Sequence, residues 1–311
     1  MTNVEAPFGN AYDVEADRDS NIHDFISYIK GRIDFKSAYS TLRERSTPMS
    51  CLLAGQIAID EVYSSERLAE ASWNFDLAEV SLEAATESAL NYHRTGTVLG
   101  LIRTQGIHLS LHKAIAIDGS MPSTSLISKA YSQTTQLLHE LGQLEPDQID
   151  ETSTFNGMLS ELVILALGHQ LSLRQSESDQ QLAFVPSLAR QDHASARRKR
   201  SLSHAWDVSA FSPGAKELEV AHKIQVKSWA GASRYAPAGY AKDISVVQIY
   251  PDLAVDPDEF VINTITKEVQ ELEQQPESIW IQNIEVRLAK FAKILGIKPL
   301  AHVARAFAKA S

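Results

Sequence analysis

The sequence contains a single cysteine, Cys51, among 311 residues. One thiol cannot form an intrachain disulfide, and it cannot supply the several thiolates of a cysteine-based zinc site. A chain so poor in cysteine suits a reducing compartment, so we expect a cytoplasmic protein. The sequence also lacks any apolar run near the roughly 20 residues that span a bilayer, and residues 1–20 are polar and acidic, unlike a signal peptide. We therefore expect no membrane association.

Several motifs that identify common enzyme classes are missing. The chain has no GxxxxGK[ST] loop, no GxGxxG fingerprint and no GxSxG elbow, and its histidines show no HExxH spacing. The sequence therefore gives no support for a P-loop nucleotide-binding protein, a dinucleotide-binding protein, a hydrolase with a nucleophile elbow or an HExxH metalloprotease. Acidic residues outnumber basic residues, 39 to 29, so the formal net charge is −10 at pH 7. Any nucleic-acid surface must therefore be a local basic patch.

The residues that are present describe a folded chain with a helical first half. Hydrophobic residues make up 44% and charged residues 22%, which is a normal globular balance. After Ser20, a candidate N-cap, apolar residues recur with the spacing of one buried helical stripe: Ile22, Phe25, Ile26, Ile29 and Ile33. A polar, acidic break at 145–156 indicates a boundary. We predict a helical domain over 1–150 and a second domain over 151–311.

The helical domain resembles tetratricopeptide-like arrays in its Ala-rich antiparallel helices. A repeat of about 34 residues with the corresponding signature is absent, so an irregular helical bundle is the preferred interpretation. Nothing in residues 1–150 points to catalysis. We expect this domain to bind a protein partner or to regulate access to the second domain.

The second domain changes from helical to β texture. One further helix is predicted within 156–173, and short β-branched or aromatic segments then predict strands within 182–189, 204–211, 219–229 and 243–250. Turn residues separate the last three segments. The chain is predicted to close with three helices. The first is expected to begin at Asp256 and to carry Val261 in its apolar stripe.

One group of residues in the β segments has the composition of a catalytic site. Side chains alternate along a strand, so Gln225 and Lys227 face one side and Ile224 and Val226 the other. If the preceding β segment is adjacent, Asp207 reaches the same place. A carboxylate, an amide oxygen, a strand carbonyl and waters can hold Mg²⁺ or Mn²⁺, and a nearby lysine can stabilise charge on a phosphoryl group. The pattern therefore suits metal-assisted phosphodiester hydrolysis.

These residues resemble a known family. Asp207 followed by Gln225-Val226-Lys227 is similar to the motif of the PD-(D/E)xK, or restriction-endonuclease-like, nucleases, in the D…QxK form of the Mrr-like enzymes. The resemblance implies a mixed β-sheet flanked by helices, with the motif-bearing hairpin at its centre. It also implies that Asp207 and Gln225 ligate the metal and that Lys227 is the catalytic lysine. Glu161, on the helix before the sheet, matches the additional acid of the family.

Basic residues near this motif are candidate contacts to a nucleic-acid backbone. A dense cluster precedes the motif, and two further basic residues follow it in a loop: Arg197, Arg198, Lys199, Arg200, Arg234 and Lys242. The ordinary interpretation of such a charge run is a solvated loop.

Two hypotheses of different classes follow. The first is a Mg²⁺-dependent endonuclease that cleaves DNA or RNA, with DNA favoured, and a role in bacterial or phage defence by analogy. The second is a noncatalytic helical adaptor with a degenerate nuclease-like fold. In that case Asp207 and Lys227 form an ordinary ion pair or face water separately. Convergence of Asp207, Gln225 and Lys227 within reach of one metal ion distinguishes the two.

Overall fold

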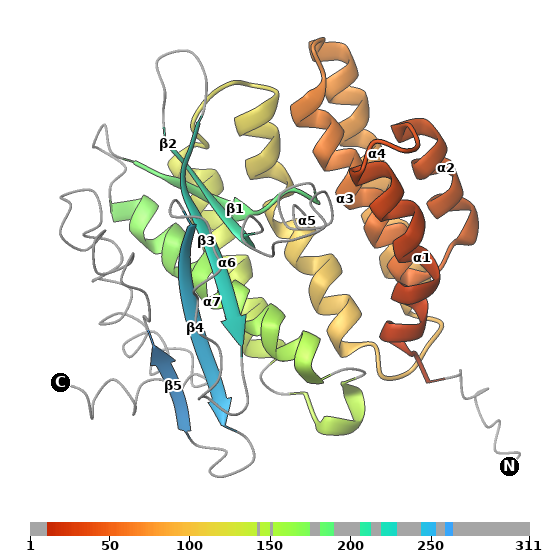
Figure 1. Cartoon of the computed structure of the whole chain (residues 1–311). Helices are drawn as coiled ribbons and strands as arrows, with labels where there is room; N and C mark the ends of the chain where they lie inside the picture. The colour runs from red at the N-terminus through yellow and green to blue at the C-terminus, as the bar shows by residue number, and fades with distance from the viewer. Residues whose placement is uncertain are drawn as a thin grey trace, which may run out of the picture.

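The computed structural model describes residues 11–141, 144–149, 152–174, 181–189, 206–212, 219–228, 244–252 and 259–263. Helices come first along the chain and strands follow, which confirms the helical N-terminal part (Figure 1). The helices that precede the predicted boundary are α1 (Val14–Ile29), α2 (Phe35–Arg45), α3 (Pro48–Ser64), α4 (Leu68–Ala89), α5 (Gly96–Ala116) and α6 (Thr124–Leu141). A 3₁₀ turn, η1 (Pro146–Gln148), and α7 (Thr152–Arg174) come next.

Aspartate side chains cap the starts of α1 and α2. The carboxylate of Asp13 accepts a hydrogen bond from the Ala16 N–H (2.9 Å), and Asp34 does the same for Ser37. The prediction that Ser20 caps the first helix is therefore wrong, since α1 begins six residues earlier at Val14. The apolar stripe after Ser20 marks the buried face of the helix and not its start.

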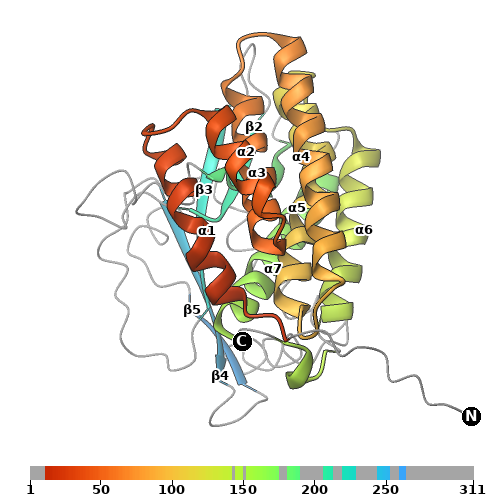
Figure 2. The ribbon, with the colours of Figure 1, turned by 90° about the vertical axis from the view of Figure 1, so that its right-hand side faces the viewer.

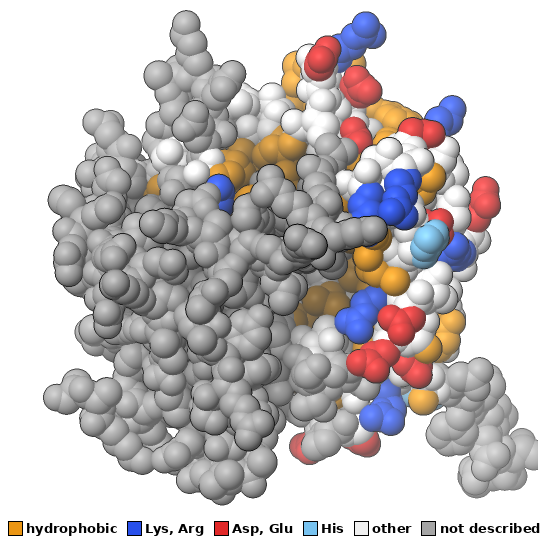
Figure 3. Space-filling model, in the orientation of Figure 1, with side chains coloured by type: hydrophobic (Ala, Val, Ile, Leu, Met, Phe, Trp, Pro, Cys, Tyr) orange, Lys and Arg blue, Asp and Glu red, His pale blue; other side chains and the backbone are white. Residues whose placement is uncertain are grey.

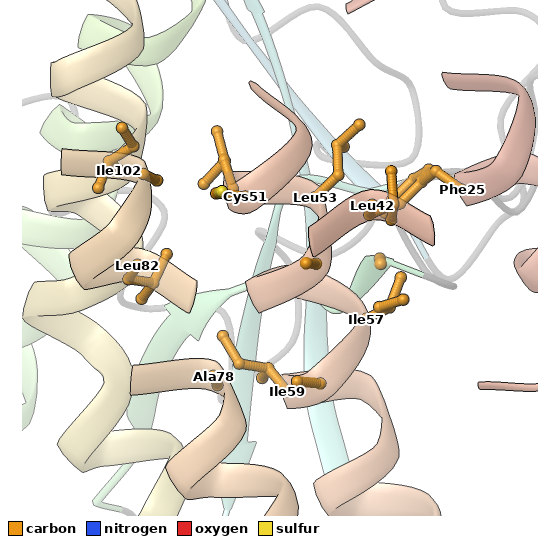
Figure 4. Packing of buried hydrophobic residues seen from close by; sticks show 14 of the residues in the cluster. Phe25, Leu42, Cys51, Leu53, Ile57, Ile59, Ala78, Leu82 and Ile102 are labelled. Carbon is orange, nitrogen blue, oxygen red and sulfur yellow. The ribbon is translucent and has the colours of Figure 1, made fainter. Parts of the chain in front are cut away.

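Helix α3 is the centre of the helical bundle. Its residues Cys51, Leu53, Ile57 and Ile59 lie between two walls of buried side chains, as Figure 4 shows. One wall comes from α1 and α2 and the other from α4 and α5; the labelled members are Phe25, Leu42, Ala78, Leu82 and Ile102. Because α3 has apolar neighbours on several sides, it is buried almost all round.

A half-buried carboxylate joins α1 to the start of α3. Asp17 Oδ1 accepts hydrogen bonds from the Thr47 hydroxyl (2.6 Å) and the Asn21 amide (2.7 Å). Its other oxygen, Oδ2, accepts from the Tyr12 hydroxyl (2.6 Å) and the Met49 N–H (3.0 Å). Four donors thus satisfy one charge and fix the entry of α3 against α1.

The strands form one five-stranded sheet in the order β1-β2-β3-β4-β5. Their bounds are β1 (Ala183–Pro186), β2 (Val208–Ser212), β3 (Glu219–Ser228), β4 (Ile244–Asp252) and β5 (Glu259–Asn263). The first three strands are antiparallel to one another, β4 is parallel to β3, and β5 is antiparallel to β4. The sheet is therefore mixed, and β3 is its central strand.

The end of the sheet corrects one prediction. Val261 lies in β5, where it pairs with Tyr250 of β4, and not in the first turns of a closing helix. The segment Glu-Phe-Val-Ile-Asn has the β-branched and aromatic content of a strand, and pairing with β4 overrides the cap signal at Asp256. Asp256 itself and the other predicted closing helices lie outside the described residues.

Helix α7 connects the bundle to the sheet. It packs against α5 and α6 on one side and against β1, β2 and β3 on the other. Leu137, Leu138 and Leu141 of α6 share a buried cluster with α7 and with Ile224 and Val226 of β3. The helices on either side of residue 150 thus share one core. In Figure 2, α4, α5 and α6 lie side by side while β4 and β5 extend away from them.

A close approach between α7 and β1 depends on a glycine. A Cβ atom built on Gly168 would lie 2.3 Å from Cγ of Phe184 and 2.8 Å from its Cβ. Phe184 is fully buried in β1. The absence of a side chain at position 168 therefore allows the aromatic ring to lie directly on the helix.

Candidate functional site

Asp207 and Gln225 meet at the start of β2. Asp207 lies one residue before that strand, and its backbone is held from two sides. Its N–H donates to the Ile224 carbonyl (2.9 Å), and its carbonyl accepts from the Ser187 N–H (2.8 Å). These bonds place the Asp207 residue between the end of β1 and the middle of β3.

The carboxylate of Asp207 accepts hydrogen bonds from two groups of β3. Oδ2 accepts from the backbone N–H of Val226 (2.6 Å) and from the side-chain amide of Gln225. Gln225 is only 2% exposed. Because a carboxylate accepts but does not donate, the amide nitrogen of Gln225 must face it. The structure thus brings the acid and the amide of the motif into direct contact.

A strand carbonyl oxygen lies beside this pair. The amide nitrogen of Gln225 lies 3.3 Å from the carbonyl oxygen of Val226 as well as against Asp207 Oδ2. A partly positive N–H group therefore occupies the place where a small cation would meet the same two oxygens. Rotation of the amide by 180° would add its oxygen as a third ligand. Carboxylate, carbonyl and amide oxygens are ligands of Mg²⁺, so the donor set fits that ion.

The remaining motif residues lie on β3 and on α7. Lys227 is in β3, two residues beyond Gln225, and pairs with Gln248 of β4; its side chain lies outside the described residues. Glu161 is half-buried on α7, the helix that packs against β3. The residues predicted to contact a nucleic-acid backbone all lie outside the described residues: Arg197, Arg198, Lys199, Arg200, Arg234 and Lys242.

A tryptophan and a lysine lie beside Asp207. The Trp206 indole N–H donates to the Ser209 hydroxyl (2.8 Å), which fixes the ring. The ammonium of Lys223 lies 5.1 Å from the centre of that ring, within the range of a cation–π interaction. Sequence reasoning had not singled out Lys223. The signal was present, since Lys223 lies two residues before Gln225 and alternation assigns both to one face of β3.

A buried histidine pair was also missed. His108 of α5 and His169 of α7 stack with ring centroids 5.1 Å apart, and their Nε2 atoms are 2.9 Å apart. Nδ1 of His108 lies 2.7 Å from the Thr104 carbonyl and must donate to it. In the neutral ring Nε2 of His108 is then the acceptor, so His169 donates from Nε2 and its Nδ1 is a buried acceptor without a partner. Sixty-one residues separate the two, which hides the pair in the sequence.

Burial changes the proton affinity of this histidine cluster. Desolvation lowers the pKa of His108 to about 4, although the Thr104 carbonyl partly opposes the shift. His112, whose Nδ1 lies 2.9 Å from the Tyr63 hydroxyl, has its pKa lowered to about 3 by burial and by His108. The pKa of His169 is lowered well below its usual value for the same reasons. The cluster is therefore neutral at pH 7 and joins α5 to α7.

No protein-family model, no curated protein and no solved structure matches this chain. Among the described residues, no group of three or more His, Cys, Asp or Glu side chains is arranged to hold a metal ion. In the same residues, no helix has both the length and the apolar character needed to cross a bilayer.

Proposed function

We propose that this protein is a divalent-metal-dependent nuclease with a restriction-endonuclease-like second domain. The observation that carries the proposal is the contact between Asp207 and Gln225 across β2 and β3, with the Val226 carbonyl beside them. Mg²⁺ or Mn²⁺ is the proposed ion, and nucleic acid, with DNA favoured over RNA, is the proposed substrate.

The topology of the sheet supports the proposal. The family places the motif on a central hairpin of a mixed sheet flanked by helices. Here Asp207 directly precedes β2 and Gln225 lies on β3, and α7 packs against these two antiparallel strands. The next strand, β4, runs parallel to β3. A parallel pair needs a long crossover connection, and residues 229–243, which connect the two strands here, lie outside the described residues.

Each residue of the site has a defined task in this proposal. Asp207, Gln225 and the Val226 carbonyl would hold the ion, which would supply Lewis-acid stabilisation of the phosphate and a more acidic water. Lys227, expected on the face of Gln225, stabilises negative charge on the phosphate as the bond to the leaving oxygen breaks. Trp206 and Lys223 contact the strand beside the scissile phosphate through ring stacking and charge.

The direct test is cleavage by the purified protein. Plasmid, single-stranded DNA and RNA are incubated with Mg²⁺ or Mn²⁺, and Lys227→Ala is compared with Lys36→Ala, a change of an exposed lysine on α2. We expect the first variant to lose cleavage and the second to match the parent protein. Equal activity in all three proteins contradicts the proposed site and indicates a contaminating nuclease.

One observation favours the noncatalytic adaptor as a second candidate. Asp207 Oδ2 already accepts two hydrogen bonds, and Gln225 is almost completely buried, as in a purely structural link between strands. Isothermal titration of Mn²⁺ distinguishes the two candidates. Binding that disappears in Asp207→Asn supports the nuclease, whereas no binding in the parent protein together with no cleavage supports the adaptor.

A further inference from the structure

The outer face of α4 carries two parallel rows of side chains. One row is apolar, with successive spacings of four, three and four residues: Trp73, Leu77, Val80 and Ala84. The other row is acidic and lies beside it: Asp76, Glu79, Glu83 and Glu87. At 100° per residue both rows lie away from the buried face of the helix, which is formed by residues such as Ala78 and Leu82.

The apolar row is unusually exposed. Trp73 is 54% exposed and Val80 is 50% exposed, whereas Leu77 and Ala84 are half-buried and pack against the helical core. Tryptophan is among the residues most enriched at the energetic centres of protein interfaces. The spacing of the row is that of a coiled-coil seam, which another helix can cover along its length. The row thus has the composition and the spacing of a helix-binding surface.

The acidic row has no internal counter-charge. Helix α4 contains five acidic residues and no lysine or arginine over its 22 residues. None of the four carboxylates in the row takes part in an ion pair within the described part of the chain. The helical surface seen in Figure 3 differs, because acidic and basic side chains are interspersed there. Within the described residues, the outer face of α4 therefore carries negative charge that no ion pair neutralises.

A groove extends the same surface toward α5 and α6. It has a volume of about 490 Å³, with a floor that includes Leu82, Ile102 and Ile107 and a rim that includes Gln133 and Gln136. Glu83 belongs both to the acidic row and to the groove wall. The row and the groove are therefore continuous, and a partner lying along α4 can contact both.

We propose that the outer face of α4 is a docking surface for a basic amphipathic helix of a partner protein. A helix of that kind covers Trp73 and Val80 with its apolar side and neutralises the acidic row with lysines or arginines. A second copy of this chain is disfavoured, since it would bring two acidic rows together. Nucleic acids and anionic lipid surfaces are disfavoured by the same negative charge.

The test uses the full chain and a dye-labelled synthetic peptide of about 20 residues with leucines in a heptad seam and flanking lysines. Fluorescence anisotropy measures its affinity for the parent protein, for Trp73→Ala and for Asp76→Asn/Glu83→Gln. We expect each variant to bind at least about tenfold more weakly, with affinity falling as salt rises. Because both changes are on an exposed face, the melting temperature should stay within a few degrees of the parent value.

A matched control separates docking from general attraction between opposite charges. Glu15→Gln/Asp19→Asn removes two exposed carboxylates from α1 and should leave affinity within about twofold. Equal loss in this control, or no peptide binding by the parent protein, overturns the proposal. Sedimentation equilibrium tests the competing occupant: a dimer that Trp73→Ala converts to a monomer would also overturn it. None of these results depends on nuclease activity.

Discussion

Two half-buried carboxylates hold distant segments together in this protein, and they do so with different partners. In the helical bundle, Asp17 shares its two oxygens among two hydroxyls, an amide and a backbone N–H from α1, its flanking segment and α3. In the sheet, Asp207 directs one oxygen to two donors that both belong to β3. The partners of Asp17 thus come from several segments, whereas these two donors to Asp207 come from a single strand.

The two carboxylates differ in whether a metal ion could replace their hydrogen-bond partners. The partners of Asp17 are mainly hydroxyl and backbone groups locked into helix caps, so replacing them by a metal ion would break the start of α3. Asp207 instead meets a side-chain amide that presents nitrogen or oxygen after a simple rotation. A carboxylate beside a rotatable amide and a strand carbonyl is able to pass from a hydrogen-bonded state to a metal-bound one. We therefore expect a structural role for Asp17 and propose a metal-binding role for Asp207.

The largest effect is expected for Asp207→Asn. Removal of the charge that holds the ion should lower the cleavage rate by about 1,000-fold, about 4 kcal/mol in transition-state stabilisation. The melting temperature should change little, because the asparagine oxygen still accepts from β3. Gel-based cleavage kinetics and a thermal melt measure both quantities. A large drop in melting temperature with cleavage intact would reverse the assignment of roles.

The second-largest effect is a loss of folding stability at low pH, caused by the buried histidines between α5 and α7. The pKa of His108 is about 4 in the folded state and about 6.5 when the chain unfolds, so the unfolded state binds more protons between these values. Stability is therefore complete above pH 6.5 and declines as pH falls toward 4, by about 3 kcal/mol for this residue. Urea unfolding at several pH values measures the decline.

The control for the pH experiment is the exposed His23 of α1. His23→Gln should retain the full decline in stability, whereas His108→Gln should make it shallower, with the remainder coming from His112 and His169. If both variants keep the slope of the parent protein, carboxylates and not the buried pair govern acid unfolding.

Asp17→Asn should affect stability and not chemistry. The change weakens charge-assisted bonds from Tyr12, Thr47 and Met49 and should lower the free energy of unfolding by about 2 kcal/mol. Asp19→Asn on the same helix is the control and should change it by less than about 0.5 kcal/mol. Chemical denaturation measures both. Cleavage per folded molecule should equal that of the parent protein, and a specific loss would give Asp17 a functional role.

Two glycines of α7 give a matched test of the packing between helix and sheet. Gly168→Ala should destabilise the protein by about 1–2 kcal/mol, since its Cβ would overlap the Phe184 ring. Gly157→Ala, where no atom lies within 4 Å of the new Cβ, should stabilise it by about 0.5–1 kcal/mol. Opposite shifts in melting temperature are the expected outcome. Shifts of the same sign would mean that β1 is not held tightly on α7.

The smallest effect is expected for Lys223→Gln beside the site. Loss of one cation near Asp207 should weaken single-stranded DNA binding by about threefold and reduce the salt dependence of binding by about one counter-ion. Filter binding across a salt series in Ca²⁺ measures both values. An unchanged salt slope would limit Lys223 to packing on Trp206.

Local patterns were sufficient to predict most elements. Helical spacing of apolar residues located the bundle, and β-branched segments located the strands around Asp207 and Gln225. The errors occurred where a local signal competed with a distant one. Ser20 looked like a cap but lies inside α1, because Asp13 supplies the acceptor for the first turn. Asp256 looked like a helix start, but pairing with β4 makes residues 259–263 a strand.

The sequence by itself determined the helical first half, the strand alternation that assigns Gln225 and Lys227 to one face, and the acidic charge, because each depends on residues close together in the chain. Only the tertiary structure decided that Asp207 contacts Gln225, that His108 stacks on His169 and that α7 shares a core with both the bundle and the sheet. Asp207 and Gln225 are 18 positions apart in the sequence, and His108 and His169 are 61 positions apart. The geometry of these contacts is set by the packing of whole helices and strands, which no local spacing encodes.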